Sequence, residues 1–293
     1  MTTKEERIND VEIKENTEVK ESFKINKSRV KIFGVTIWRI FAYIIIYSIV
    51  GFFVETIYGT ITKGLIESRQ SFLYGPFCAV YGIGAAAMIV CLRKFEKSHN
   101  RLFIGGFILG SIIEYTVSLL GEMILHVKWW DYSNQPFNIN GRICIGFGVF
   151  WGILAMYLLG SFNPKIDKLI NLIKNKIKSE KLMKIFIIFT TLFMIGDCFI
   201  TGVAIKCFEI RKIEEYNLNV ENRLEITELY DKIYGNEIVS KFIYKFWGDR
   251  KMIRTFPNLK IKDRNGNMIY FDTLVPDVQT YYYKIYDKQK FIK

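Results

Sequence analysis

The sequence predicts an all-α transmembrane helical bundle of about five spans, followed by a small C-terminal α+β extramembrane segment. Two observations lead to this prediction. Hydrophobic residues make up 50% of the 293-residue chain and are concentrated in long runs within residues 40–207, whereas both ends are rich in Lys, Glu and Asn. Basic residues also gather beside alternate runs, as the cytoplasmic loops of membrane proteins require.

The first 36 residues are polar and mixed in charge. A secretory signal peptide needs an apolar stretch of about 7–15 residues near its start, and no such stretch opens this sequence. We expect residues 1–36 to form a disordered cytoplasmic tail. The first apolar run would then serve as an uncleaved membrane anchor.

Residues 37–207 are predicted to form a transmembrane domain of five helices. A spanning helix needs about 20 mostly apolar residues to cross roughly 30 Å of hydrocarbon. Five runs meet or approach this length. They cover residues 37–61, 72–92, 102–125, 143–162 and 185–207.

Two of these runs contain GxxxG pairs, Gly106 with Gly110 and Gly148 with Gly152. Small residues at this spacing let two helix backbones approach closely in a membrane. We expect the pairs to pack helices of the bundle together. Association of two copies of the chain through the same faces, giving a homo-oligomer, is the alternative.

The net charge of +12 reflects membrane orientation, and we expect no nucleic-acid partner. Basic residues cluster before the first run, after the second and after the fourth, where seven lysines lie between Lys165 and Lys184. The positive-inside rule places these clusters, and the N-terminus, in the cytoplasm. Five spans then place residues 208–293, the predicted C-terminal extramembrane domain, outside.

The C-terminal domain carries two local signals. Residues 222–247 place apolar side chains at helical spacing with charges between them, which indicates an amphipathic helix. Residues 258–261 and 267–271 flank Asn265-Gly266, a strong signal for a tight turn. The sequence therefore predicts a β-hairpin after the helix.

Acidic residues inside the apolar runs are the best functional candidates, because ionised groups are costly in hydrocarbon. A helix rises about 1.5 Å per residue, which places Glu114 and Asp197 near the membrane midplane. Glu55 and Glu122 fall nearer the outer surface. Each acid also has a structural explanation, namely pairing with an arginine or hydrogen bonding to a neighbouring helix.

Two polar residues of the outer loops are expected to accompany these acids. Asp131 follows the third run, and Arg142 stands at the start of the fourth. The planar guanidinium of Arg142 can bind a carboxylate bidentately. The sequence therefore predicts an outward-facing polar vestibule that leads to Glu114 and Asp197 and binds a cation or a proton.

The sequence gives little support for an enzyme. The five cysteines lack CxxC or CxxH spacing, the two histidines, His99 and His126, lack metal-ligand spacing, and no Walker A motif occurs. We expect no metal, no cofactor and no catalytic site. Acid/base chemistry at the outer carboxylates stays open as a third possibility.

Short motifs follow one another in a fixed order between residues 41 and 202. They include residues 55–58, 72–77, 130–133 and 136–144, and their marked positions are Gly75, Pro76, Tyr81, Gly82, Trp130, Tyr132, Asn140, Gly141 and Trp151. This combination resembles the bacterial membrane family of type IV ABC-transporter permeases. The resemblance implies a multi-pass protein of the bacterial plasma membrane that works with an ATPase on a separate chain.

Two functions follow from these observations. The first is a permease-like protein, either the membrane subunit of an ABC-type transporter or an ion-coupled transporter. The second is a membrane scaffold or sensor that does not transport and whose C-terminal domain binds a partner in the cell envelope.

Overall fold

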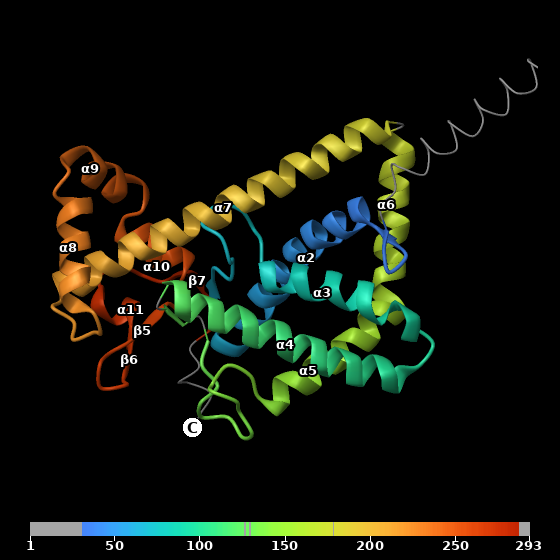
Figure 1. Ribbon diagram of the computed structural model, residues 1–293, viewed down its shortest axis with the longest axis horizontal. Helices are drawn as coiled ribbons and strands as arrows, with labels where there is room; N and C mark the ends of the chain where they lie inside the picture. Colours follow the sequence, from blue (N-terminus) through green and yellow to red (C-terminus); the bar gives the residue numbers. More distant parts are fainter. Residues whose placement is uncertain (1–30, 126, 129, 178, 287–293) are drawn as a thin grey trace, which may run out of the picture.

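The computed structural model describes residues 31–125, 127–128, 130–177 and 179–286, most of which are helical (Figure 1). Most of the predicted N-terminal tail, as well as His126, lies outside these residues. The described chain opens with a short antiparallel pair, β1 (Lys31–Ile32) and β2 (Val35–Thr36). This pair leads directly into the first helix.

Four helices lie side by side and form the bundle (Figure 1). They are α2 (Ile37–Lys63), α3 (Ala79–Leu92), α4 (His99–Leu125) and α5 (Ile145–Tyr157). A 3-10 turn, η1 (Arg93–Phe95), lies between α3 and α4. The long helix α7 (Glu180–Glu215) runs obliquely past the bundle into the C-terminal domain.

Within the described residues, four helical segments are long and apolar enough to cross a membrane. They are Ile37–Lys63, His99–Ile124, Ile145–Ile177 and Glu180–Glu215. With the shorter α3, they agree with the predicted bundle of about five spans.

The second predicted run, residues 72–92, is helical only from Ala79 onward. Residues 72–78 form an irregular loop, which we call the entry loop. Gly75 has a φ of +123°, a conformation that favours glycine, and Pro76 has no backbone N–H to donate to a helix. These two residues explain why an apolar run does not continue as a helix.

Helix α5 is joined to α6 (Asn163–Ile177) through a π-helical turn, η2 (Leu158–Phe162). Helix α6 lies across one end of the bundle, on the right in Figure 1. Its Ile166 and Ile170 face the bundle core, whereas Leu169 and Leu172 are exposed. The lysine-rich segment that the sequence marks as a cytoplasmic loop is thus an amphipathic helix.

The C-terminal domain packs around the second half of α7. Buried residues of α7, including Ile205 and Phe208, share a core with Met252 and Phe271. Its elements are α8 (Arg223–Tyr234), α9 (Glu237–Phe246), α10 (Asp249–Thr255), β5 (Lys260–Lys262), β6 (Met268–Tyr270), α11 (Phe271–Leu274) and β7 (Tyr281–Lys284).

The predicted β-hairpin is confirmed, because β5 pairs antiparallel with β6 around the Asn265-Gly266 turn. The predicted amphipathic helix is divided into α8 and α9. The side chain of Asn236 accepts hydrogen bonds from the backbone N–H groups of Ile238 and Val239 and so caps α9. The chain therefore starts a separate helix, α9, directly after Asn236.

Two strand pairings attach the C-terminal domain to loops of the bundle. Strand β3 (Leu65–Glu67), which follows α2, pairs with β7, and β4 (Val127–Lys128), which follows α4, pairs with β5. The C-terminal domain therefore lies at the end of the bundle opposite α6, as Figure 1 shows.

The glycines of the two GxxxG pairs lie at the contact between α4 and α5 within one chain. A Cβ atom at Gly106 would lie 2.8 Å from the backbone oxygen of Trp151, and one at Gly152 would lie 2.7 Å from the ring of Phe103. Both distances are too short for a real contact. The glycines thus serve the packing of the bundle.

Gly106→Val is expected to lower the free energy of unfolding by about 1–3 kcal/mol, because the added side chain forces α4 away from α5. Gly196→Val is the matched control, since a Cβ atom there would meet nothing within 4 Å. Thermal unfolding of both purified variants in detergent checks this. Equal midpoints for the two variants would contradict the assigned packing.

Candidate functional site

Two acidic residues of the bundle, Glu55 on α2 and Glu114 on α4, share one polar cluster. The Tyr81 hydroxyl donates to Glu55 Oε1 over 2.7 Å. The Tyr132 hydroxyl donates to Glu114 Oε1 over 2.9 Å, and Trp151 Nε1 donates to Glu114 Oε2 over 3.1 Å. We call these five residues the Glu55–Glu114 cluster. Helices α2, α3, α4 and α5 and the loop between α4 and α5 each supply one of them.

Two glycines position the aromatic members of the cluster. A Cβ atom at Gly51 of α2 would lie 2.6 Å from Cγ of Tyr81, and one at Gly110 of α4 would lie 2.5 Å from Cβ of Trp151. Only glycine lets these rings rest directly on the neighbouring backbones. The Tyr81 and Trp151 rings also contact each other, with centroids 5.8 Å apart.

The cluster places negative charge in a largely buried, aromatic setting. Glu114 is only 6% exposed and Glu55 is half-buried. The two carboxyl groups are linked through the contact between the Tyr81 and Trp151 rings, each of which donates to one of them. Burial and the nearby Glu114 carboxylate raise the pKa of the Tyr132 hydroxyl, so this hydroxyl stays protonated and donates. A site with two acids and proton-donating rings can hold a cation or a proton.

A third acid, Glu122 near the end of α4, pairs with Arg142. The guanidinium NH2 group of Arg142 lies 2.5 Å from Glu122 Oε2, and Lys128 Nζ lies 4.0 Å from Glu122 Oε1. The Arg142 guanidinium also lies over the Tyr115 ring, 5.5 Å from its centroid. The structure thus places Arg142 against Glu122 at the end of the bundle near the C-terminal domain.

The loop between α4 and α5 aims Arg142. Trp130 Nε1 donates to the backbone oxygen of Arg142 over 3.0 Å, and the backbone N–H of Tyr132 donates to the oxygen of Gly141 over 2.8 Å. Asn140 and Gly141 both have positive φ, 53° and 66°. These motif residues therefore shape the turn that holds the arginine.

Asp131 accepts hydrogen bonds within its own loop, from the hydroxyl of Ser133 over 2.6 Å and from its backbone N–H over 3.0 Å. Burial alone would raise the pKa of this carboxyl, but the two bonds, together with Lys128 and Lys260, lower it below its usual value. Asp131 therefore stays ionised. Within the described residues its hydrogen bonds come from Ser133 of the same loop, and not from Arg142.

Asp197 on α7 holds the entry loop. Both carboxylate oxygens accept from the backbone N–H of Tyr74 over 3.1 Å, and the Thr201 hydroxyl accepts from the backbone N–H of Leu73 over 2.8 Å. Asp197 is 3% exposed. Buried backbone N–H groups of a loop need such partners, because a loop lacks the internal hydrogen bonds of a helix.

The six predicted site residues lie in four separate places. Glu55 and Glu114 lie together, Glu122 lies with Arg142, Asp197 holds the entry loop, and Asp131 holds the loop between α4 and α5. The hydrogen bonds of Asp197 within the described residues lead to the entry loop and Thr201, not to Glu114. The similar depth predicted for Glu114 and Asp197 therefore does not make them partners.

Some motif residues take part in the site more directly than the sequence indicates. Tyr81, Tyr132 and Trp151 bind the two acids, and Gly82 lets α3 approach Ser48 and the backbone of α2. Thr201 has no counterpart among the predicted site residues. Its spacing of four from Asp197, on the same helix face, is the signal that could have indicated it.

The described part of the chain contains no group of three or more His, Cys, Asp or Glu side chains that could hold a metal ion. The functional groups of the Glu55–Glu114 cluster are carboxylates and aromatic rings.

Comparisons with known proteins identify the family. The model of the family described as "Putative ABC-transporter type IV" matches residues 42–202, which is more than half of the chain and extends from α2 into α7. Comparison with the curated proteins and with the solved structures gave no match. The matched range contains the Glu55–Glu114 cluster, the Glu122–Arg142 pair and the entry loop. The chain is therefore a member of this type IV ABC-transporter family.

Proposed function

We propose that this chain is the permease subunit of an ABC-type transporter and that the Glu55–Glu114 cluster binds the transported cation or proton. The observation that carries this proposal is the pair of acids held by Tyr81, Tyr132 and Trp151 within the helix bundle. Buried carboxylates in a membrane bundle typically mark an ion pathway. The Glu122–Arg142 pair would line the outer approach to the cluster.

The proposed orientation follows from charge. The lysines of α6 favour the cytoplasmic side of a bacterial plasma membrane, which places the N-terminus inside. The C-terminal domain, at the opposite end of the bundle, would lie outside.

Helix α6 is suited to pass the motion of an ATPase to the cluster. The Asp167 carboxylate lies 3.1 Å from Arg39 Nε and accepts from the Tyr43 hydroxyl over 2.6 Å, and Asn163 accepts from the Tyr47 hydroxyl over 3.1 Å. All three partners lie on α2. A displacement of α6 would therefore pull on the helix that carries Glu55.

An ATPase on another chain would contact the exposed face of α6. Leu169 and Leu172 are exposed there, beside Lys165, Lys168 and Lys176. Apolar side chains flanked by cations fit an apolar groove with an acidic rim.

Affinity purification in mild detergent, followed by mass spectrometry, tests the proposal. A nucleotide-binding ATPase is expected to co-purify in stoichiometric amount. Leu172→Glu is expected to weaken its binding about thirtyfold or more and so to lower its yield, since a hot-spot residue contributes about 2 kcal/mol or more. Leu224→Glu is the matched control, because Leu224 is 84% exposed on the C-terminal domain.

The reproducible absence of an ATPase from the wild-type preparation would contradict the ABC-type assignment. Ion-coupled transport through the same acids would then be the better hypothesis. Equal loss of the ATPase in the Leu172 and Leu224 variants would instead contradict the role of α6.

A sensor or scaffold is the second candidate, and the strand pairings favour it. Because β7 and β5 pair with the loops that follow α2 and α4, a ligand on the C-terminal domain could act on the bundle. Deletion of residues 222–293 separates the two functions. A transporter is expected to keep part of its uptake activity, whereas a sensor would lose all signalling.

A further inference from the structure

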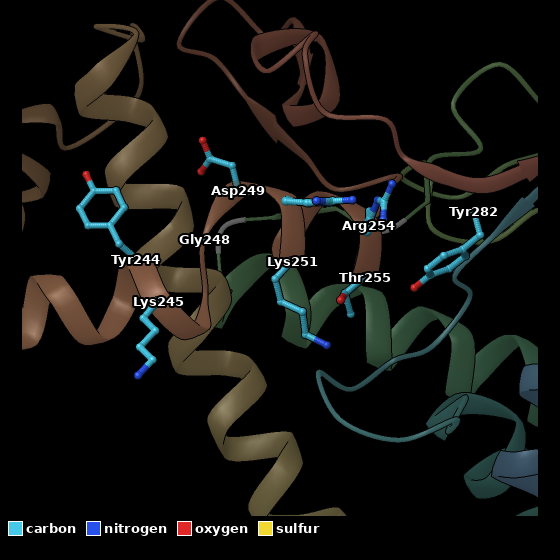
Figure 2. Close-up of a pocket in the computed structure, with 9 residues that line it drawn as sticks. Tyr244, Lys245, Gly248, Asp249, Lys251, Arg254, Thr255 and Tyr282 are labelled. Atoms are coloured by element: carbon cyan, nitrogen blue, oxygen red, sulfur yellow. The ribbon is translucent and has the colours of Figure 1, made fainter.

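A basic pocket lies between α9, α10 and β7 in the C-terminal domain (Figure 2). Its volume is about 490 Å³. Four of the side chains that line it are cationic, namely Lys245, Arg250, Lys251 and Arg254. This charge is unusual for a surface with no function, because like charges at close range repel one another.

The acidic residue that lines the pocket does not offset these charges. The Asp249 carboxylate lies 2.7 Å from the NH2 group of Arg211 and 2.6 Å from Lys212 Nζ, and both cations are buried side chains of α7. The negative charge of Asp249 is therefore already shared between two cations. The pocket keeps a net positive charge.

The pocket cations still have donor groups to offer. Lys245, Arg250 and Lys251 form no ion pair within the described residues, and Lys251 Nζ lies 5.5 Å from the centroid of the Tyr74 ring. Arg254 donates through Nε to the backbone oxygen of Gln279 over 3.1 Å. This bond leaves the two terminal nitrogens of its guanidinium for a ligand.

The cations and two tyrosines surround one space. Figure 2 shows Tyr244 and Lys245 on one side, Arg254 and Tyr282 on the other, and Lys251 between them. An arginine binds two oxygens of a phosphate at once, and lysines add charge without a fixed geometry. Tyrosine hydroxyls can donate to the remaining oxygens.

We propose that this pocket binds a phosphate group, carried either by a soluble phosphate ester or by the headgroup of an anionic lipid. A phosphate group matches three unpaired cations better than a single carboxylate does. The lipid source is within reach because Lys251 lies over Tyr74 of the entry loop, and Tyr282 and Tyr283 are exposed nearby. Aromatic side chains concentrate at the headgroup level of membranes.

The full chain in nanodiscs is the material for the test. One arm measures the binding of inorganic phosphate and glycerol 1-phosphate by calorimetry in phosphatidylcholine discs. The other arm measures, by native mass spectrometry, how much phosphatidylglycerol stays bound relative to phosphatidylcholine. Both arms compare the wild type with the triple variant Lys245→Gln, Arg250→Gln and Lys251→Gln.

The control variant carries Lys232→Gln, Lys262→Gln and Arg264→Gln, three exposed cations elsewhere in the same domain. The control variant removes three positive charges, as the pocket variant does. The pocket variant is expected to weaken phosphate binding about tenfold or more, since charge-assisted hydrogen bonds to phosphate are stronger than neutral ones. The control variant should bind like the wild type.

Loss in the soluble arm identifies a phosphate ester as the ligand, and loss in the lipid arm alone identifies a headgroup. Either result supports the site. Unchanged binding by the pocket variant in both arms, or equal loss in the control variant, would overturn it. Both arms are independent of transport, so the proposal can fail while the permease assignment stands.

Discussion

Glu114→Gln is expected to lower cation uptake about a hundredfold in vesicles that hold the chain together with its ATPase. Glutamine keeps the shape of the side chain and can still accept a hydrogen bond from Tyr132 or Trp151. It cannot carry the negative charge or the proton. A contact between a charged group and its ligand contributes up to about 3 kcal/mol, which corresponds to about a hundredfold.

Uptake is measured with ATP supplied and a panel of sodium, potassium, methylammonium and choline, with a pH-sensitive dye to follow protons. Glu237→Gln is the control, because the Glu237 side chain is 79% exposed on α9. The Glu114 variant should keep its thermal midpoint and its bound ATPase. Unchanged uptake by a folded Glu114 variant would refute the proposed role of the cluster.

Asp197→Ala is expected to lower the free energy of unfolding by about 1–3 kcal/mol, the cost of a buried donor left without a partner. The backbone N–H of Tyr74 loses both carboxylate oxygens, and Thr201 loses a contact at 3.4 Å. Asp197→Asn should cost less, because an amide oxygen can still accept from Tyr74.

Thiol labelling provides a local readout for the Asp197 variants. Cys78 is buried at the end of the entry loop, whereas Cys91 and Cys198 are exposed and would be replaced by serine. Labelling of Cys78 should accelerate in the alanine variant and stay slow in the asparagine variant. If the asparagine variant stays folded yet loses uptake, Asp197 belongs to the ion pathway as well as to the loop.

The long apolar runs predict the spanning helices well, because hydrocarbon allows few structures other than a complete helix. The break in the second run is different. Every residue from Phe72 to Phe77 except Gly75 and Pro76 is compatible with an apolar helix. Hydropathy measures only how apolar a segment is, and it does not indicate which groups accept the hydrogen bonds of its backbone. The partners of the loop, Asp197 and Thr201, lie far away in sequence.

The sequence singles out the acidic residues but does not predict how they are grouped. Depth along a helix follows from residue number and predicts Glu114 near the membrane midplane; in the structure its side chain is buried. Which helix face meets which neighbour depends on packing. Glycines at 51 and 110 let Tyr81 and Trp151 approach the acids, and this contact is visible only in three dimensions. Helix α6 could have been predicted from the spacing of Ile166, Ile170, Ile173 and Ile177.

The pairing of β3 with β7 and of β4 with β5 has a consequence for biosynthesis. Strands β5 and β7 follow all the bundle helices in the sequence, so the edges of β3 and β4 stay open until these two strands have been translated. Open strand edges invite wrong pairing and recognition by quality-control proteases. A chain that stops before β5 would thus expose both edges, and a chain that includes β5 and β7 would cover them.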